Sequence, residues 1–208
     1  MQALVLGATG ATGQELVKLL LEDSNFSKVS VFVRRAININ HEKLIIHEIN
    51  FSKLRQYKSL INGDILFSAL GTTKKQAGGK KAQFLVDYTY QYEFAKMAFE
   101  NGISHYSLVS SVGANKDSIF FYPKIKGALE ESVRIFNFKK IQIFQPPSLI
   151  RQPELMRSVE KISIKLLNGI NKLGLLKTLK PLLVKDLAKK MIDESLLSNV
   201  NRVTTYKF

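Results

Sequence analysis

Three residues that can exchange a proton with an oxygen lie in the middle of the chain. Tyr122 and Lys126 are four residues apart at the start of a predicted helix, so both side chains project from one helix face. A lysine ammonium beside a tyrosine lowers the pKa of the phenol, which permits proton exchange with a carbonyl or an alcohol near neutral pH. Ser111, or Ser110 in its place, ends the preceding predicted strand and offers a hydroxyl to the same oxygen. The alternative is that Tyr122 packs in the interior and Lys126 is solvated.

A proline directly after the tyrosine affects how this helix begins. The residue before a proline is biased away from helical dihedral angles, and proline is favoured at the first helical position. We therefore expect Tyr122 at the N-cap and Pro123 at the first position of a helix over residues 123–137. This start is compatible with a tyrosine that points into a cleft.

A glycine-rich turn near the start of the chain predicts a phosphate site. The sequence GATGATG, residues 7–13, lies between a predicted strand over residues 1–6 and a predicted helix over residues 14–21. Such a turn directs the free N–H groups and the positive dipole end of the helix at one point, which suits the pyrophosphate of a dinucleotide. The spacing is GxxGxxG instead of GxGxxG, so a turn that serves packing alone is the alternative.

The individual residues of this turn have separate expected roles. Gly7 makes the turn, Gly10 lets the backbone approach phosphate, and Gly13 lets the helix pack on the strand. The remaining cofactor contacts expected here come from Thr9, Ala11 and Thr12.

The next predicted strands supply further cofactor contacts. The strand over residues 29–33 ends in Arg34 and Arg35, where an Asp or Glu would hold the ribose 2′-hydroxyl of NAD. Two guanidinium groups instead suit a 2′-phosphate, so NADP is predicted over NAD, with a solvated basic loop as the alternative. The strands over residues 44–49 and 64–70 place other contacts near the adenine and the ribose, namely Asn50, Phe51, Ala69, Leu70 and Gly71.

Apolar runs and helical patterns alternate along most of the chain. This order predicts an α/β fold, a Rossmann-like doubly wound parallel sheet with a small, mostly helical C-terminal elaboration. We expect a single domain over residues 1–208, with 151–208 as a small substrate-side region. The other elements expected are strands over 105–110, 140–144 and 202–206, and helices over 81–101, 154–180 and 185–197.

Composition narrows the chemistry. The chain has no cysteine, which excludes disulfides and a cysteine nucleophile, and its three scattered histidines predict no metal site. No secretory leader and no membrane-spanning run is predicted, so we expect a cytoplasmic protein.

The net charge of +14 has three interpretations. They are a solvated lysine-rich surface, attraction of an anionic phosphate cofactor or substrate, and contact with nucleic acid or an anionic membrane surface. No nucleic-acid motif supports the third, so no specific nucleic acid is predicted.

Four segments together resemble a known family. GATGATG (7–13), LFSALGTT (66–73), LVSSVGA (108–114) and YPKIK (122–126) are similar to motifs of the short-chain dehydrogenases/reductases. The chain resembles most its atypical members, the NmrA-like and Tat-interacting-protein-like oxidoreductases.

This resemblance implies roles for individual residues. Ser111 would hold the substrate oxygen, Tyr122 would act as general acid/base, and Lys126 would bind the nicotinamide ribose and depress the pKa of the tyrosine. Pro146 would lie near the nicotinamide. Gln145 and Pro147 depart from the arginine and glycine that many relatives carry.

The resemblance also implies a function. The first hypothesis is an NADPH-dependent reductase of a small carbonyl substrate, and the alternative is an NADP(H)-sensing regulatory or interaction protein with little turnover. Family practice further suggests a homodimer through the helices over 81–101 and 123–137. The short stretch after residue 150 argues against a nucleotide-sugar epimerase.

Overall fold

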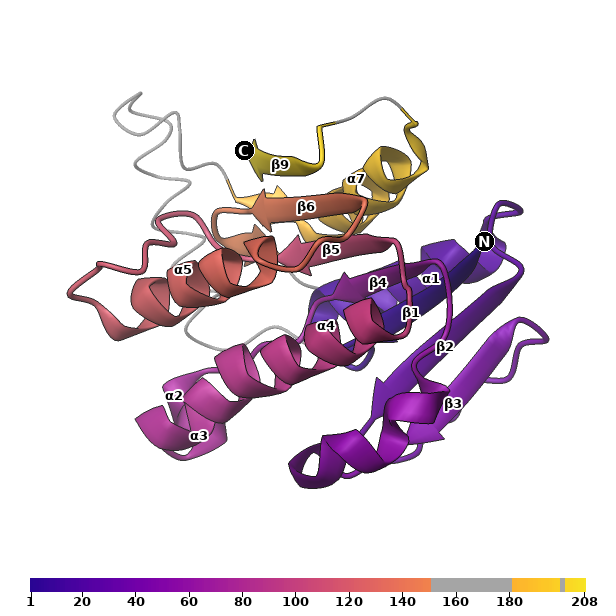
Figure 1. Cartoon of the computed structure of the whole chain (residues 1–208), viewed down its shortest axis with the longest axis horizontal. Helices are drawn as coiled ribbons and strands as arrows, with labels where there is room; N and C mark the ends of the chain where they lie inside the picture. The colour runs from indigo at the N-terminus through magenta and orange to yellow at the C-terminus, as the bar shows by residue number, and fades with distance from the viewer. Residues whose placement is uncertain (151–180, 199–200) are drawn as a thin grey trace.

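The computed structural model describes residues 1–150, 181–198 and 201–208. In this part of the chain, one sheet of seven parallel strands has the order β3-β2-β1-β4-β5-β6-β9 (Figure 1). The strands are β1 (Gln2–Leu6), β2 (Lys28–Val33), β3 (Leu44–Glu48), β4 (Ile65–Ser68), β5 (His105–Val109), β6 (Lys140–Gln145) and β9 (Val203–Lys207). The strand order reverses at β1, which lies between β2 and β4. The predicted doubly wound parallel sheet is therefore confirmed.

Helices connect these strands. They are α1 (Ala11–Glu22), the 3₁₀ segment η1 (Phe51–Leu60), α2 (Lys74–Ala77), α3 (Lys80–Phe84), the π-helical turn η2 (Leu85–Thr89), α4 (Tyr90–Glu100), α5 (Phe121–Arg134) and α7 (Val184–Leu196). The helix predicted over 81–101 is thus the run α3–η2–α4, interrupted by a π turn. Four short elements were not predicted, namely η1, α2 and the paired strands β7 (Leu149–Ile150) and β8 (Leu182–Leu183). The helix predicted over 154–180 lies outside the described residues.

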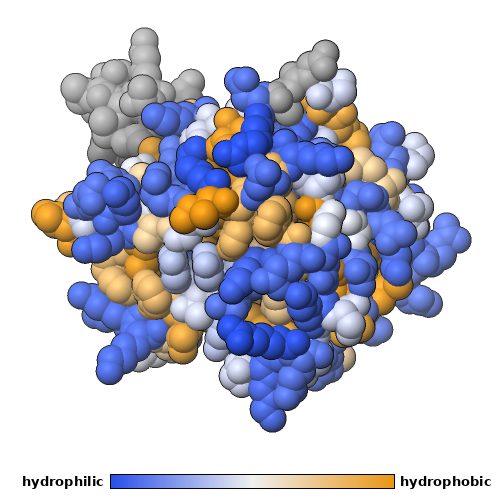
Figure 2. All heavy atoms as spheres, viewed as in Figure 1, coloured by the Kyte–Doolittle hydropathy of each residue, from blue (hydrophilic) through white to orange (hydrophobic). Residues whose placement is uncertain are grey.

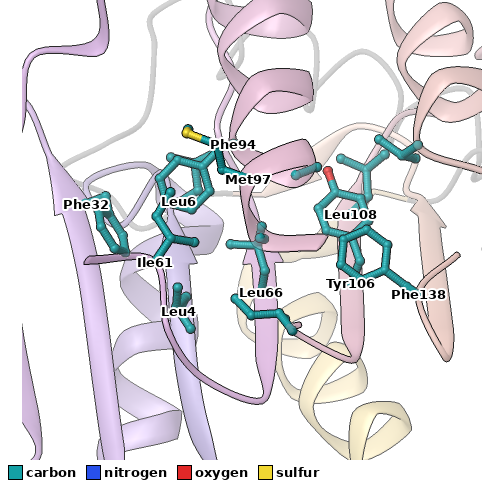
Figure 3. Close-up of a cluster of buried hydrophobic side chains, with 14 of the residues drawn as sticks. Leu4, Leu6, Phe32, Ile61, Leu66, Phe94, Met97, Tyr106, Leu108 and Phe138 are labelled. Atoms are coloured by element: carbon teal, nitrogen blue, oxygen red, sulfur yellow. The ribbon is translucent and has the colours of Figure 1, made fainter. Parts of the chain in front are cut away.

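The sheet has a buried core on each face. Along β1, Leu4 and Leu6 contribute to one core, and Ala3 and Val5 contribute to the other, because successive side chains of a strand point to opposite sides. The first core packs against η1, α4 and α5, and Figure 3 shows its side chains between the strands and α4. The second core packs against α1 and α7. Both faces are covered, as a parallel sheet requires.

The C-terminal part of the described chain joins this architecture. Helix α7 packs beside α1, and β9 pairs with β6 at the edge of the sheet. The extent of a separate substrate-side region over 151–208 stays a prediction.

Some hydrophobic side chains remain on the surface. Figure 2 shows a mostly polar face with hydrophobic atoms projecting at its left edge, over the segment that leads into α5. In that segment Ile119 is 91% and Phe120 69% exposed. Within the described ranges, no helix combines the length and the apolar character needed to cross a membrane.

Candidate functional site

A cleft of about 1170 Å³ opens where β1, β2, β3 and β4 end. This is the edge at which open parallel sheets bind ligands, beside the strand where the order reverses. Its volume exceeds the roughly 300–1,000 Å³ typical of pockets for drug-sized ligands, so it has room for a nucleotide. Ten of the predicted cofactor residues line it, namely Gly7, Thr9, Gly10, Ala11, Arg34, Asn50, Phe51, Ala69, Leu70 and Gly71.

The glycine turn forms the centre of this cleft. Gly7 has a φ of +90°, and a Cβ there would lie 2.6 Å from the backbone carbon of Ala69, so β1 and β4 approach closely only with glycine. The amide of Gly10 donates to the carbonyl of Gly7 (2.9 Å). A Cβ on Gly13 would collide with that same carbonyl oxygen.

Helix α1 begins three residues earlier than predicted, at Ala11. Gly10 is its N-cap and supplies no side-chain cap, and both residues line the cleft. The first turn of α1 is therefore directed at the cleft, where its positive dipole end favours an anion. This cradle fits the pyrophosphate of a dinucleotide.

The rim of the cleft carries charges of both signs. Arg34 follows β2 and lines the cleft, whereas Arg35 is exposed and is not among the described lining residues. Glu48, the last residue of β3, pairs in register with Val33 and also lines the cleft. Glu48 was not predicted, since an acidic residue at a strand end carries no signal without its neighbour. Thr12 is buried and lies outside the described lining as well.

An aromatic wall was also missed. The side-chain Oδ1 of Asn50 caps η1 by accepting from the backbone amide of Ser52 (2.9 Å). The backbone N–H of Asn50 donates to the Tyr57 hydroxyl (3.3 Å). Phe51 contacts Tyr90 with ring centroids 5.5 Å apart. Both tyrosines line the cleft together with the two predicted residues. Flat aromatic surface of this kind is suited to contact with a base.

The three predicted catalytic residues lie at and beyond the end of β5. Lys126 is buried, and its Nζ donates to the carbonyl of Val109 (2.8 Å). Tyr122, one turn earlier on α5, is 41% exposed. The alternative of a packed tyrosine and a solvated lysine is therefore the reverse of what the structure shows. The Ser111 hydroxyl donates to the carbonyl of Val112 (3.2 Å).

Burial shifts the titration of this lysine. Removal from water lowers the pKa of Lys126, and the nearby carboxylates of Asp87 and Glu130 act in the opposite direction and raise it. Neither carboxylate was singled out from the sequence. Glu130 was recognisable only as the residue four positions after Lys126 on the same helix face.

Ser110 has a structural role. It is buried, and its hydroxyl donates to Glu130 Oε1. Gln145 at the end of β6 donates from Nε2 to both carboxylate oxygens of Glu130 (3.0 Å each). Ser110 and Gln145 thus fix the ends of β5 and β6 to α5. Ser111 is not part of this network, so it remains the candidate for binding a substrate oxygen.

The predicted start of the helix is wrong. Helix α5 begins at Phe121 with Phe120 as N-cap, so Tyr122 and Pro123 are its second and third residues. Proline is tolerated throughout a first turn because those amides have no acceptor within the helix. Helix α5 also lies very close to the loop that precedes it, because a Cβ on Gly127 would collide with the backbone of Asn115 and Lys116.

The two groups of predicted residues are adjacent but separate. Among the described residues, the lining of the cleft includes none of Ser111, Tyr122, Lys126 and Pro146. Pro146 is buried and its carbonyl accepts from the Val112 amide (2.9 Å), next to Ser111. The connection between the groups runs through Thr72, a lining residue whose amide donates to Asp87 Oδ1 (2.9 Å). No cluster of three potential metal ligands occurs in the described part of the chain.

Known proteins with similar sequences carry the same domain. A family model described as NAD(P)H-binding matches residues 7–134. The chain is 33% identical to the rat protein HTATIP2 over 170 residues, which are 80% of this chain and 70% of that protein. It is 38% identical to the protein FMP52, mitochondrial, of Saccharomyces cerevisiae over 153 residues, 72% of this chain and 66% of that protein.

Solved structures share the fold. WbmH of Bordetella bronchiseptica, in complex with NAD⁺, superposes with a TM-score of 0.74 at 15% identity, over 100% of this chain and 74% of that one. A UDP-glucose 4-epimerase of Thermotoga maritima gives a TM-score of 0.71 at 13% identity, over 100% and 77%. The family match and the similarity to HTATIP2 and FMP52 show that the chain belongs to the NAD(P)H-binding family, among the NmrA-like and Tat-interacting-protein-like proteins that its motifs resemble.

Proposed function

We propose that the protein is an NADPH-dependent oxidoreductase that reduces a small carbonyl compound. The observation that carries the proposal is that a nucleotide-sized cleft and the predicted catalytic residues lie at the same edge of the sheet. A glycine-turn cleft with Arg34 on its rim lies next to a strand end where Lys126 is buried one helical turn from Tyr122.

The cofactor would lie in the cleft. The first turn of α1 would hold its pyrophosphate, Arg34 and Arg35 its 2′-phosphate, and Asn50 and Phe51 its adenine end. When bound, NADPH supplies a hydride to the carbonyl carbon. Its nicotinamide half would have to extend past Thr72 toward Pro146, because the described lining of the cleft ends before the catalytic residues.

The chain's own residues would handle the oxygen and its proton. Ser111 would donate a hydrogen bond to the substrate oxygen, and Tyr122 would donate the proton that the oxygen acquires. The charge of the Lys126 ammonium would lower the pKa of the Tyr122 phenol toward neutrality.

The first experiment measures binding of NADPH and NADH by calorimetry. We expect the wild type to bind NADPH more tightly, and the double variant Arg34→Ala/Arg35→Ala to lose at least tenfold in NADPH affinity with little change for NADH. Arg55→Ala, an exposed arginine on η1, is the control and leaves both affinities unchanged. Equal binding of both cofactors by wild type and double variant would contradict the NADPH assignment.

The second experiment tests turnover. A screen of small aldehydes and ketones with NADPH identifies a substrate, and Tyr122→Phe is then expected to lower kcat by a factor of at least 100 while NADPH affinity stays within twofold. Unchanged turnover in Tyr122→Phe would remove the tyrosine from the mechanism.

An NADP(H)-sensing regulatory or interaction protein is the second candidate. It is favoured by one observation, the absence of Ser111, Tyr122 and Lys126 from the described lining of the cleft. Tight NADPH binding without turnover of any carbonyl in the screen would support it over the enzyme.

We also propose a cytoplasmic location. The yeast relatives carry the word mitochondrial in their names, so imaging of the tagged protein in its own cell is the direct test.

A further inference from the structure

A buried carboxylate links the nucleotide cleft to the catalytic lysine. Asp87 lies in the π-helical turn η2 and is 1% exposed. Its Oδ1 accepts from the amide of Thr72, and a Cβ on Gly71 would lie 3.4 Å from the same oxygen. Gly71 and Thr72 both line the cleft. One carboxylate oxygen therefore holds this wall of the cleft.

The backbone of Asp87 is fixed as well. Gln91, fully buried on α4, donates from Nε2 to the Asp87 carbonyl (3.0 Å) and accepts through Oε1 from the Ser68 hydroxyl (2.9 Å). Ser68 ends β4. The π turn that carries Asp87 is thus bound to the strand whose end forms the cleft wall, so its carboxylate has a defined position.

By hydrogen-bond geometry the second oxygen of Asp87 has no partner within the described residues, although the buried side chain of Gln83 lies close enough to help lower the pKa of this carboxyl. A buried carboxylate in that state is destabilising unless a positive charge compensates it. Burial raises the pKa of Asp87, while the ammonium of Lys126 is the largest of the effects that lower it.

Lys126 has the complementary need. It is buried, and its Nζ donates to the neutral carbonyl of Val109. Of the two carboxylates that favour its charged form, Glu130 already accepts from Ser110 and twice from Gln145. Asp87 is the carboxylate whose Oδ2 accepts no hydrogen bond by geometry within the described residues.

We propose that Asp87 is a positioning residue: one carboxylate oxygen holds the Gly71–Thr72 wall of the cleft, and the negative charge of the carboxylate, buried in the same region, keeps the Lys126 ammonium charged. The part that concerns catalysis rests on the proposed function. The carboxylate makes the shape of the cleft and the charge of the lysine depend on one group.

Two substitutions separate these two roles. Asp87→Asn keeps an acceptor oxygen for the Thr72 amide but removes the negative charge. Asp87→Ala removes both. Glu131→Gln, an exposed carboxylate next to Glu130 on α5, is the matched control for a change of charge.

The readouts do not require catalysis. The pKa of Lys126 is followed by NMR of the cofactor-free protein with ¹³C-labelled lysine, with Lys126→Met to assign the signal. We expect Asp87→Asn to lower this pKa by at least one unit and to leave the Thr72 amide signal in place. In Asp87→Ala the Thr72 signal moves too, and NADPH affinity falls about tenfold.

A Lys126 pKa in Asp87→Asn that stays within 0.2 units of wild type would overturn the inference, as would a Thr72 signal and NADPH affinity unchanged in Asp87→Ala. If Asp87→Ala does not fold, the nearly isosteric Asp87→Asn decides the charge role. A wild type that binds no NADPH would instead contradict the proposed function, and the two NMR readouts would still test Asp87.

Discussion

The charged residues on the cleft rim are the ones that the proposed cofactor preference depends on. Arg34 follows β2, and Glu48 ends the adjacent strand β3, so a 2′-phosphate held by the arginine as proposed would lie near a carboxylate. We expect Glu48→Gln to raise NADPH affinity about threefold to tenfold at low salt. The substitution removes a repulsion of about 1 kcal/mol between the carboxylate and the 2′-phosphate. Calorimetry at several salt concentrations measures the gain, which shrinks as salt screens it.

The control for this substitution is Glu42→Gln, an exposed carboxylate that does not line the cleft. In Glu48→Gln, NADH affinity is expected to change by less than twofold, because NADH has no 2′-phosphate. A strong loss of NADH affinity in Glu48→Gln would show that Glu48 accepts from the ribose hydroxyls, and would assign the site to NAD.

At this scale the sequence predicts backbone-defined positions well and side-chain networks poorly. The residues of the glycine turn were placed at the cleft because their role depends on local spacing. Glu48, Asp87 and Glu130 were missed because each acquires its meaning from a partner that only the fold brings near. Arg35 faces solvent for the same reason, since spacing along the chain does not fix the direction of an exposed side chain.

Among the elements, α7 depends on a charge that comes from a strand. Lys140, the first residue of β6, is 3% exposed, and its Nζ donates to three carbonyls at the end of α7, those of Glu194 (2.6 Å), Ser195 (3.2 Å) and Leu197 (2.8 Å). The last carbonyls of a helix have no partner within the helix, and its negative dipole end favours a cation. The lysine therefore anchors α7 to the sheet.

We expect Lys140→Met to lower the free energy of unfolding by about 3 kcal/mol, because three carbonyls at the end of the helix lose a charged donor. Chemical denaturation followed by circular dichroism measures the loss. Lys139→Met, the exposed neighbour, is the control and is expected to change stability by less than about 0.5 kcal/mol. Equal stabilities of the two variants would contradict the anchoring role.

The predicted elements agree best with the structure where the apolar pattern is strong. Strands β2 and β6 were placed within one residue because short segments rich in Val, Ile and Phe predict buried strands even where a polar residue interrupts them. The segments η1 and η2 were missed because 3₁₀ and π turns do not follow the 3.6-residue period. The early start of α5 was missed because the bias of the residue before a proline away from helical dihedral angles is a preference, which Tyr122 does not follow.

For the whole molecule, we propose a homodimer through the face of α4 and α5, which pack side by side (Figure 1). An aromatic row crosses this face, with centroid distances of 5.9 Å for Tyr88–Tyr92, 5.4 Å for Tyr92–Phe136 and 5.8 Å for Phe136–Phe99. Ile135, at the end of α5, is 82% exposed. These partly buried rings and the exposed Ile135 give a second copy of the chain apolar groups to cover.

Sedimentation velocity tests this assembly. We expect a dimer in the wild type and a monomer in Ile135→Lys, since a buried unpaired charge at the interface opposes association. Ile39→Lys, in the loop after β2, introduces the same charge at another exposed isoleucine and is expected to leave the dimer intact.

Each chain carries a net charge of +14, so two copies repel each other and added salt should strengthen the dimer by screening. Contact with a polyanion would weaken with salt instead. The sign of the salt dependence therefore separates self-association from binding to nucleic acid or an anionic membrane, and a wild type that stays monomeric at every salt concentration would contradict the dimer.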